Sequence, residues 1–140
     1  KRVCYVTLNK TYDSLKELFV KKKVNVSNIV FIDAISKTIK KMSDNTKDCY
    51  FCSSPGVLTE LSLVITKMLK QNFEYVIFDS LTNLMVYTKK APVAMFVSSL
   101  VNKIKTSKTK AVFYALSMKE QAELIQETSM FVDKVVEMGK

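Results

Sequence analysis

The residues of this chain best suited to chemistry follow a short apolar run. Tyr75-Val76-Ile77-Phe78 is followed at once by Asp79 and Ser80. In an open parallel sheet, a buried strand of this kind brings its last polar residues to the crevice outside the strand ends. Carboxylate and hydroxyl oxygens suit a hydrated Mg²⁺ ion. The pattern therefore predicts Asp79 as a metal ligand, and Asp79 with Ser80 as part of a cofactor-binding site.

Other apolar runs also end in polar residues: Asn9-Lys10, Asp33, Ser53-Ser54 and Ser117. Together with Asp79, a lysine and a second carboxylate would suit a phosphorylated ligand, so Asn9 and Lys10 join the predicted cofactor site. Taken singly, such positions are more typical of turns and helix caps. Both interpretations stay open for Asp33 and the serines.

Several kinds of chemistry are disfavoured by composition. The chain has 140 residues, two glycines, three cysteines and no histidine. Neither Gly56 nor Gly139 fits a glycine-rich phosphate loop. Without histidine, histidine base catalysis is excluded and the usual zinc sites are disfavoured. Cys49 and Cys52 form a C-x-x-C pattern, but residues three apart on a strand point to opposite faces. We expect buried, inert thiols, with a redox pair as the alternative.

The chain is strongly basic, because it has 22 basic and 13 acidic residues and a net charge of +9. Arg2 is the single arginine, and lysines cluster at 21–23, at 37–41 and at 103–110. Non-specific attraction to nucleic acid is possible, but sequence-specific reading favours arginine. A lysine-rich solvated surface is the favoured interpretation.

Strand-like and helix-like patterns alternate along the chain. Apolar runs predict strands at Val3–Leu8, Ile29–Ile32, Cys49–Cys52, Tyr75–Phe78, Ala111–Leu116 and Val132–Met138. Helical spacing predicts helices from Thr11 to Lys22, from Ser54-Pro55 to Gln71, over 93–106 behind Pro92, and from Ser117 to Glu127. A loop or short helix is expected at 36–47 and again before Lys90. This alternation predicts one α/β domain over 1–140, three-layered, with a mostly parallel sheet and helices on both faces.

Two expectations concern the setting of the domain. No apolar stretch approaches the length of a membrane helix, so we expect a cytoplasmic protein without membrane contact. Because the chain opens on Lys1 rather than methionine and a strand begins at Val3, we expect it to be incomplete at its N-terminus.

The order of the runs resembles the RecA/KaiC-like branch of the P-loop ATPases. Cys4–Asn9, Ile29–Asp33 and Tyr75–Thr82 carry the likeness, and Ser53–Leu61 resembles uncharacterised archaeal relatives of that group. The resemblance implies a RecA-like core, places Asp79 in the second nucleotide motif as the magnesium ligand with Ser80 behind it, and suggests ATP as the cofactor. It also implies self-assembly, for which helix 93–106 and residues 36–47 are candidate surfaces.

Departures from that family shape the functional hypotheses. The family's phosphate loop lies upstream of the strand that begins at Val3, and Asn9 stands where its catalytic glutamate belongs. An amide cannot take a proton from water. The first hypothesis is therefore a catalytically degenerate binding or regulatory module, weakly binding ATP and Mg²⁺ through Asp79 and Lys10, with a homo-oligomer or protein partner. The alternatives are an active ATPase with its phosphate loop upstream of Lys1, and a nucleic-acid binder using the lysine clusters.

The resemblance also predicts the place of one strand. In sheets of this family the phosphate-loop strand adjoins the strand matching Ala111–Leu116, which adjoins the one matching Tyr75–Phe78. Without the phosphate-loop strand, the sheet should end in a bare apolar edge.

Overall fold

A computed structural model describes residues 2–39, 46–116, 125–126, 132 and 134–136 of the chain. In chain order, the named strands and helices of the described residues are β1 (Val3–Thr7), α1 (Tyr12–Lys21), β2 (Ile29–Asp33), α2 (Ser36–Ile39), β3 (Cys49–Phe51), α3 (Leu58–Leu69), β4 (Tyr75–Asp79), α4 (Leu81–Tyr87), α5 (Lys90–Lys105) and β5 (Lys110–Phe113). No helix in this part of the chain is long and apolar enough to cross a membrane.

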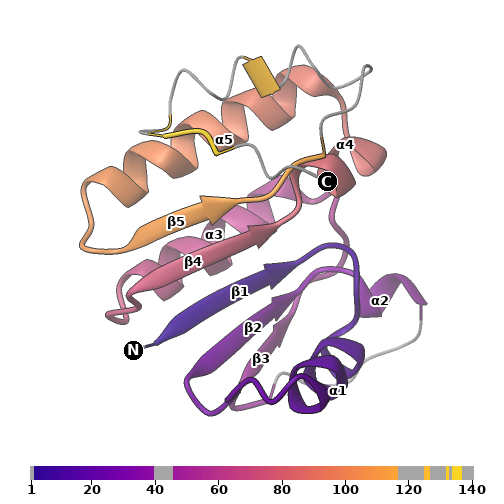
Figure 1. The fold of residues 1–140 in the computed structure, drawn as a ribbon. Coiled ribbons are helices and arrows are strands. Elements are labelled where there is room, and N and C mark those ends of the chain that lie inside the picture. Colours follow the sequence, from indigo (N-terminus) through magenta and orange to yellow (C-terminus); the bar gives the residue numbers. More distant parts are fainter. Residues whose placement is uncertain (1, 40–45, 117–124, 127–131, 133, 137–140) are drawn as a thin grey trace.

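The five strands form one parallel sheet in the order β3-β2-β1-β4-β5. Helices cover both faces, with α1 on one side and α3 and α5 on the other (Figure 1). The predicted three-layer α/β fold is confirmed. The predicted neighbourhood of the fourth and fifth strands is confirmed as well, since β5 pairs with β4 along residues 75–78.

Side-chain alternation along the strands divides the core into two clusters. Cys4 and Val6 of β1 point to the large cluster beneath α3 and α5, which also holds Val76 and Phe78. Tyr5 of β1 points the other way, to a smaller aromatic cluster beneath α1. Parallel strands buried on both faces need continuous apolar runs, so these strands can be recognised in the sequence.

The helix boundaries show where local signals succeed and fail. Thr11 caps α1 as predicted, its hydroxyl accepting from the backbone N–H of Ser14 at 3.2 Å. The predicted helix start at Ser54-Pro55 is wrong, because α3 begins at Leu58 behind Val57. The hydroxyl of Ser54 accepts from the backbone N–H of Gly56 at 3.1 Å instead, and so closes a turn ahead of the helix.

Other predicted elements also differ from the structure or lie outside the described residues. Helix α5 begins at Lys90, so that Pro92 lies in its first turn, where a missing N–H costs nothing. Strand β5 ends at Phe113 rather than Leu116. The predicted helix 117–127 lies almost wholly outside the described residues, and residues 132 and 134–136 of the predicted last strand are not in a strand.

The three cysteines are buried and free, as expected. Cys49 packs beneath α1 and Cys52 lies in the cluster on the opposite face of the sheet, so the C-x-x-C pair cannot close. Burial raises the pKa of Cys4 and of Cys52 to about 12, and it also raises the pKa of Cys49.

Native thiols should therefore be inert. At pH 8 we expect no reaction of the folded protein with an aromatic disulfide reagent, because buried thiols with raised pKa values supply almost no thiolate. After unfolding in guanidinium, the three cysteines should all react. Rapid labelling of the folded protein, or a Cys49–Cys52 disulfide in mass spectrometry, would contradict this expectation.

Candidate functional site

The strand order creates one topological switch point. From β1 the chain builds the sheet towards β2 and β3, and then returns to add β4 and β5 on the other side of β1. The crevice at such a point lies outside the carboxyl ends of β1 and β4. Asn9 and Lys10 follow β1, and Asp79 and Ser80 end and follow β4. The fold thus gathers all four predicted site residues at the position where open α/β sheets bind ligands.

Asp79 is the half-buried carboxylate of this crevice. The Tyr5 hydroxyl donates a hydrogen bond to its Oδ2 atom at 2.7 Å, from the neighbouring strand and on the face of the sheet that α1 partly covers. The peptide bond between Asp79 and Ser80 is cis. Burial and the bond to Asp79 raise the pKa of Tyr5, so the phenol stays a proton donor at neutral pH.

The Ser80 side chain caps a helix. It is the N-cap of α4: its hydroxyl accepts from the backbone N–H of Asn83 at 3.2 Å and donates to the Asn83 side chain at 2.6 Å. Because Ser80 is buried and its hydroxyl is held in the cap, it is poorly placed to bind a metal ion.

The loop after β1 is folded around the hydroxyl of Thr7. This hydroxyl accepts from the backbone N–H groups of Asn9 and Lys10, at 3.4 and 3.2 Å, and donates to the Lys10 carbonyl at 2.7 Å. The Asn9 and Lys10 side chains are exposed above it. In a phosphate-binding loop such N–H groups point at the anion, but here they point at the chain's own threonine.

Asp33 has the role that sequence reasoning left open. Its carboxylate is fully buried and accepts from the backbone N–H groups of Tyr12, Ile35 and Ser36 at 2.7–2.8 Å, and also from the Ser36 hydroxyl. Tyr12 is the first residue of α1, Ser36 is the first residue of α2, and Ile35 directly precedes α2. Asp33 is therefore the shared anion of two helix starts. Asp33 is the last residue of β2, and a serine three residues later is compatible with capping α2, but nothing in the sequence indicates the bond to α1.

The consequence for ligand binding is direct. In doubly wound folds the phosphate sits at the N-terminus of the helix that follows the first strand, drawn by free N–H groups and the helix dipole. At α1 the Asp33 carboxylate holds that place, and Thr11 satisfies the N–H of Ser14. The chain has filled this anion site with its own side chain.

Asp79 lies too far from Asp33, the other strand-end carboxylate, to share a metal ion with it. In register across the sheet, Thr7 stands between Asp33 and Asp79, so the two carboxylates are two strand spacings apart, roughly 10 Å. Among the described residues, no group of three acidic, histidine or cysteine side chains could hold a metal ion. Asp79 can contribute one oxygen to a hydrated ion but cannot build a cage.

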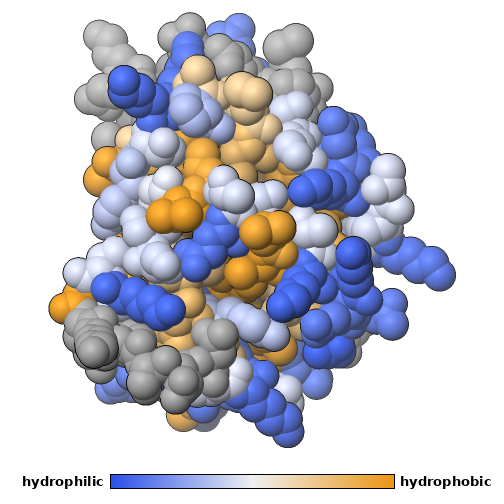
Figure 2. All heavy atoms as spheres, turned by 180° about the vertical axis from the view of Figure 1, so that it is seen from behind, coloured by the Kyte–Doolittle hydropathy of each residue, from blue (hydrophilic) through white to orange (hydrophobic). Residues whose placement is uncertain are grey.

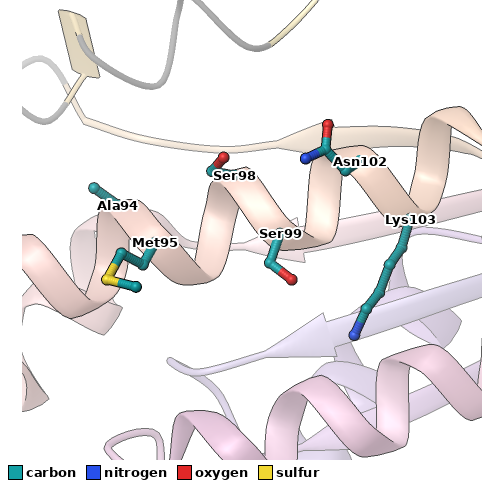
Figure 3. A pocket seen from close by; sticks show the side chains of 6 residues that line it. All are labelled: Ala94, Met95, Ser98, Ser99, Asn102 and Lys103. Atoms are coloured by element: carbon teal, nitrogen blue, oxygen red, sulfur yellow. The ribbon is translucent and has the colours of Figure 1, made fainter.

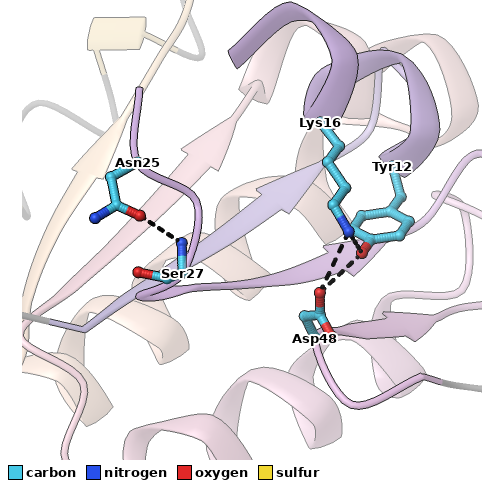
Figure 4. Close-up of polar contacts among 5 residues, drawn as sticks. All are labelled: Tyr12, Lys16, Asn25, Ser27 and Asp48. Atoms are coloured by element: carbon cyan, nitrogen blue, oxygen red, sulfur yellow. Dashed lines mark hydrogen bonds and ion pairs between the residues drawn. The ribbon is translucent and has the colours of Figure 1, made fainter. Parts of the chain in front are cut away.

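A second polar group braces α1 against the sheet (Figure 4). The Tyr12 hydroxyl donates to Asp48 Oδ2 at 3.0 Å, while the Lys16 amino group donates to the Tyr12 hydroxyl at 3.1 Å and lies 3.7 Å from Asp48 Oδ2. Asp48 directly precedes β3. The group is half-exposed, and its partners satisfy one another, which is typical of a structural brace.

A hollow with a volume of about 580 Å³ lies elsewhere, on the outer side of α5 near α3 (Figure 3). It is lined by Ala94, Met95, Ser98, Ser99, Asn102 and Lys103. The Lys103 amino group donates across to Ser62 and Thr66 of α3 at 3.3 and 3.2 Å. These residues offer no acid–base pair or nucleophile with an activating base, so the switch point remains the better candidate site.

Comparison with protein-family models and with curated proteins finds no match for this chain. What the structure itself defines is a parallel α/β domain with a half-exposed carboxylate at its switch point and a closed helix N-terminus beside it.

The role of Asp33 can be tested by its removal. Asp33→Ala should lower the free energy of unfolding by about 2–4 kcal/mol, because several buried N–H groups lose their acceptor. Asp13→Ala removes an exposed carboxylate from the first turn of the same helix and should cost at most about 1 kcal/mol. Urea denaturation followed by circular dichroism measures both, and equal losses in the two variants would contradict the capping role of Asp33.

The Tyr5–Asp79 bond should appear in the pH dependence of stability. Because the pKa of Tyr5 is raised in the folded protein, its contribution is complete below the unfolded pKa of about 10 and is lost as pH rises towards the folded value. Denaturation between pH 8 and 11 should show a shallower alkaline decline for Tyr5→Phe than for the wild type. Tyr87→Phe, at an exposed tyrosine of α4, is the control and should follow the wild type. Parallel curves for all three proteins would refute the assignment.

Proposed function

We propose that this chain is a catalytically degenerate RecA/KaiC-like domain that acts as a binding or regulatory module. In this proposal its ligand site is the crevice at the carboxyl ends of β1 and β4, where Asp79 and Lys10 bind a magnesium–nucleotide weakly. The observation that carries the proposal is the half-buried Asp79 at this switch point, which is bonded to the Tyr5 hydroxyl at 2.7 Å and lies opposite Thr7, rather than a second carboxylate, in the register with β1.

The groups around Asp79 support binding without hydrolysis. Tyr5 is a protonated phenol, and Asn9 presents an amide at the position where the resembled family has its catalytic glutamate. Neither can act as a general base towards water at neutral pH. Asp79 would have to be magnesium ligand and base at once, which argues against turnover.

The groups that remain available define what the crevice could hold. The second oxygen of Asp79 can meet a hydrated magnesium ion, and exposed Lys10 can approach a phosphate as a point charge. With the backbone N–H groups of the β1–α1 loop turned to Thr7, no cradle surrounds the phosphate. We therefore expect a dissociation constant for Mg–ATP on the order of 1 mM, which corresponds to about −4 kcal/mol.

Binding and turnover should be measured on the same protein. In an NMR titration with Mg–ATP, the wild type should show millimolar shift changes near Asp79 that weaken when the magnesium is chelated. Asp79→Ala should remove this magnesium dependence, while Asp48→Ala, a half-exposed carboxylate beside Lys16, should leave it intact. Phosphate release should equal the buffer level in all three proteins.

Two results would overturn the proposal in different ways. Phosphate release that Asp79→Ala abolishes would establish an active ATPase. No shift change at 10 mM Mg–ATP would remove nucleotide from the proposal, and an equal loss in Asp48→Ala would move the site away from the switch point.

A further inference from the structure

The parallel fold gathers lysines from distant parts of the sequence at one edge of the sheet. Helices α1, α3 and α5 return between parallel strands, so the loops after them lie where β2, β4 and β5 begin. These strand starts lie on the side of the N-terminus (Figure 1). Exposed lysines occur there at 21–23, at 67 and 70, and at 105, 108 and 110. Together with exposed Arg2, directly before β1, they form what we call the basic edge.

Little negative charge accompanies the basic edge. From the last turn of α1, α3 and α5 to the start of the strand that follows each, the single carboxylate is Glu74. Asp48, directly before β3, is bonded to Tyr12 and Lys16. At the carboxyl edge, by contrast, aspartates end β2 and β4. Figure 2 shows hydrophilic residues crowded along its right-hand side, where the strands begin. Positive charge is therefore concentrated at one edge of the described structure.

Helix dipoles account for only part of this pattern. Lysines 21, 67 and 105 lie in the last turns of α1, α3 and α5, where they meet the negative end of each dipole. That interaction fades within the last turn, yet lysines 22, 23, 70, 108 and 110 lie beyond it. Among the described residues, none of these outer lysines forms an ion pair with a carboxylate. Their charges are available to a partner.

Lys23 is retained against the preference of its own backbone. It follows the C-cap of α1 with a φ of 62°, and its N–H donates to the Val20 carbonyl at 3.0 Å. Helix ends favour glycine at such a left-handed position, because a Cβ atom costs free energy there. Local costs of this kind are typical of residues that serve a function.

The charged groups follow one another along the edge. In the strand order β2-β1-β4-β5, lysines 21–23 come first, then Arg2, then lysines 67 and 70, and then the lysines at β5. The row covers three strand spacings, roughly 15 Å. Arg2 is fixed in its middle, because its Nη1 atom donates to the Gln71 carbonyl at 2.8 Å and its guanidinium lies 4.3 Å from the centre of the Phe73 ring.

We propose that the basic edge binds the phosphate backbone of duplex nucleic acid without reading its sequence. A duplex carries about one negative charge per 1.7 Å of its axis, so a row of this length meets several phosphates. Lysine approaches a phosphate as a point charge, whereas base readout is mainly the work of arginine and the amide side chains. Lysines in loops of a rigid sheet edge suit the first task and not the second.

The apolar residues at this edge favour a duplex over other polyanions. Val20 and Val24 are its exposed large hydrophobic residues, and both are aliphatic. Single strands bind largely by stacking on exposed aromatic side chains, and membrane surfaces favour aromatic anchors as well. The exposed tyrosines lie elsewhere, with Tyr87 at the end of α4 and Tyr114 behind β5.

Fluorescence anisotropy with a short labelled DNA duplex of mixed sequence tests the proposal. With about five phosphate contacts, the dissociation constant should rise roughly 500-fold between about 50 and 200 mM salt. An RNA duplex of the same sequence is titrated beside it, because both carry the phosphate backbone, and the tighter complex identifies the source. The unlabelled single strand and phosphatidylserine vesicles should compete less well than either duplex.

Matched double variants locate the surface. Lys22→Gln with Lys108→Gln should weaken duplex binding at least about tenfold at about 50 mM salt and make the log–log salt slope less steep by about 2. Lys37→Gln with Lys89→Gln removes the same charge from exposed lysines at the carboxyl edge. This control should bind within about twofold of the wild type.

Lys23 offers a test that separates binding from folding. Lys23→Gly should raise the urea midpoint, because glycine adopts the left-handed conformation without a Cβ penalty, and should still weaken duplex binding. Asn72, in the loop before β4, has a φ of 59°. Asn72→Gly is the uncharged control at the same edge and should leave duplex binding unchanged. A Lys23→Gly protein that binds like the wild type would remove this residue from the surface.

Several results would overturn the proposal. These are no binding of either duplex, binding that salt does not weaken, an equal loss in both double variants, or tighter binding of the single strand or the vesicles. The proposal is independent of the nucleotide site, which lies at the opposite edge of the sheet. Asp79→Ala should therefore bind the duplex like the wild type. Duplex binding without any Mg–ATP response would contradict the function proposed above and leave the basic edge standing.

Discussion

Two helix starts at the carboxyl edge of the sheet depend on one buried carboxylate. Asp33 lies at the end of β2, and none of its hydrogen-bond partners is a cation. It accepts hydrogen bonds from the backbone N–H groups of the first residue of α1 and of the start of α2. A buried charge is tolerable only when such donors satisfy it. Its oxygens accept the hydrogen bonds that the N–H groups of two helix starts would otherwise donate to water. The same bonds hold α1 over β2 and β3.

That arrangement explains why the neighbouring crevice looks like a ligand site and yet lacks a phosphate cradle. The fold brings the ends of β1 and β4 together at a switch point, and Asp79 stands there half-buried with Tyr5 as its donor. The N–H groups that would meet a phosphate are already bonded to Asp33, Thr7 and Thr11. Satisfying these groups internally stabilises the loop without glycines, and it leaves a carboxylate and a lysine as the functional groups of the site.

Sequence patterns located the strands well because two-sided burial demands continuous apolar runs, and Tyr75–Phe78 and Ile29–Ile32 are of this kind. Helix starts were harder to predict. Thr11 and Ser80 act as caps, whereas Ser54 closes a turn and α3 begins behind Val57 without a side-chain cap. The same residue type serves a cap or a turn with similar local energies, so the surrounding packing decides between them.

What the sequence determined by itself was the class of fold and the burial of its cysteines, since periodicity and burial follow from local composition. It also marked Asp33 and Asp79 as acidic residues at strand ends. Only the tertiary structure separated their roles. Asp33 meets N–H groups from two helices and becomes a cap, while Asp79 meets a single phenol and stays half-exposed. The strand order β3-β2-β1-β4-β5 was likewise decided by packing, because contacts between strands far apart in the chain leave no signature in any one segment.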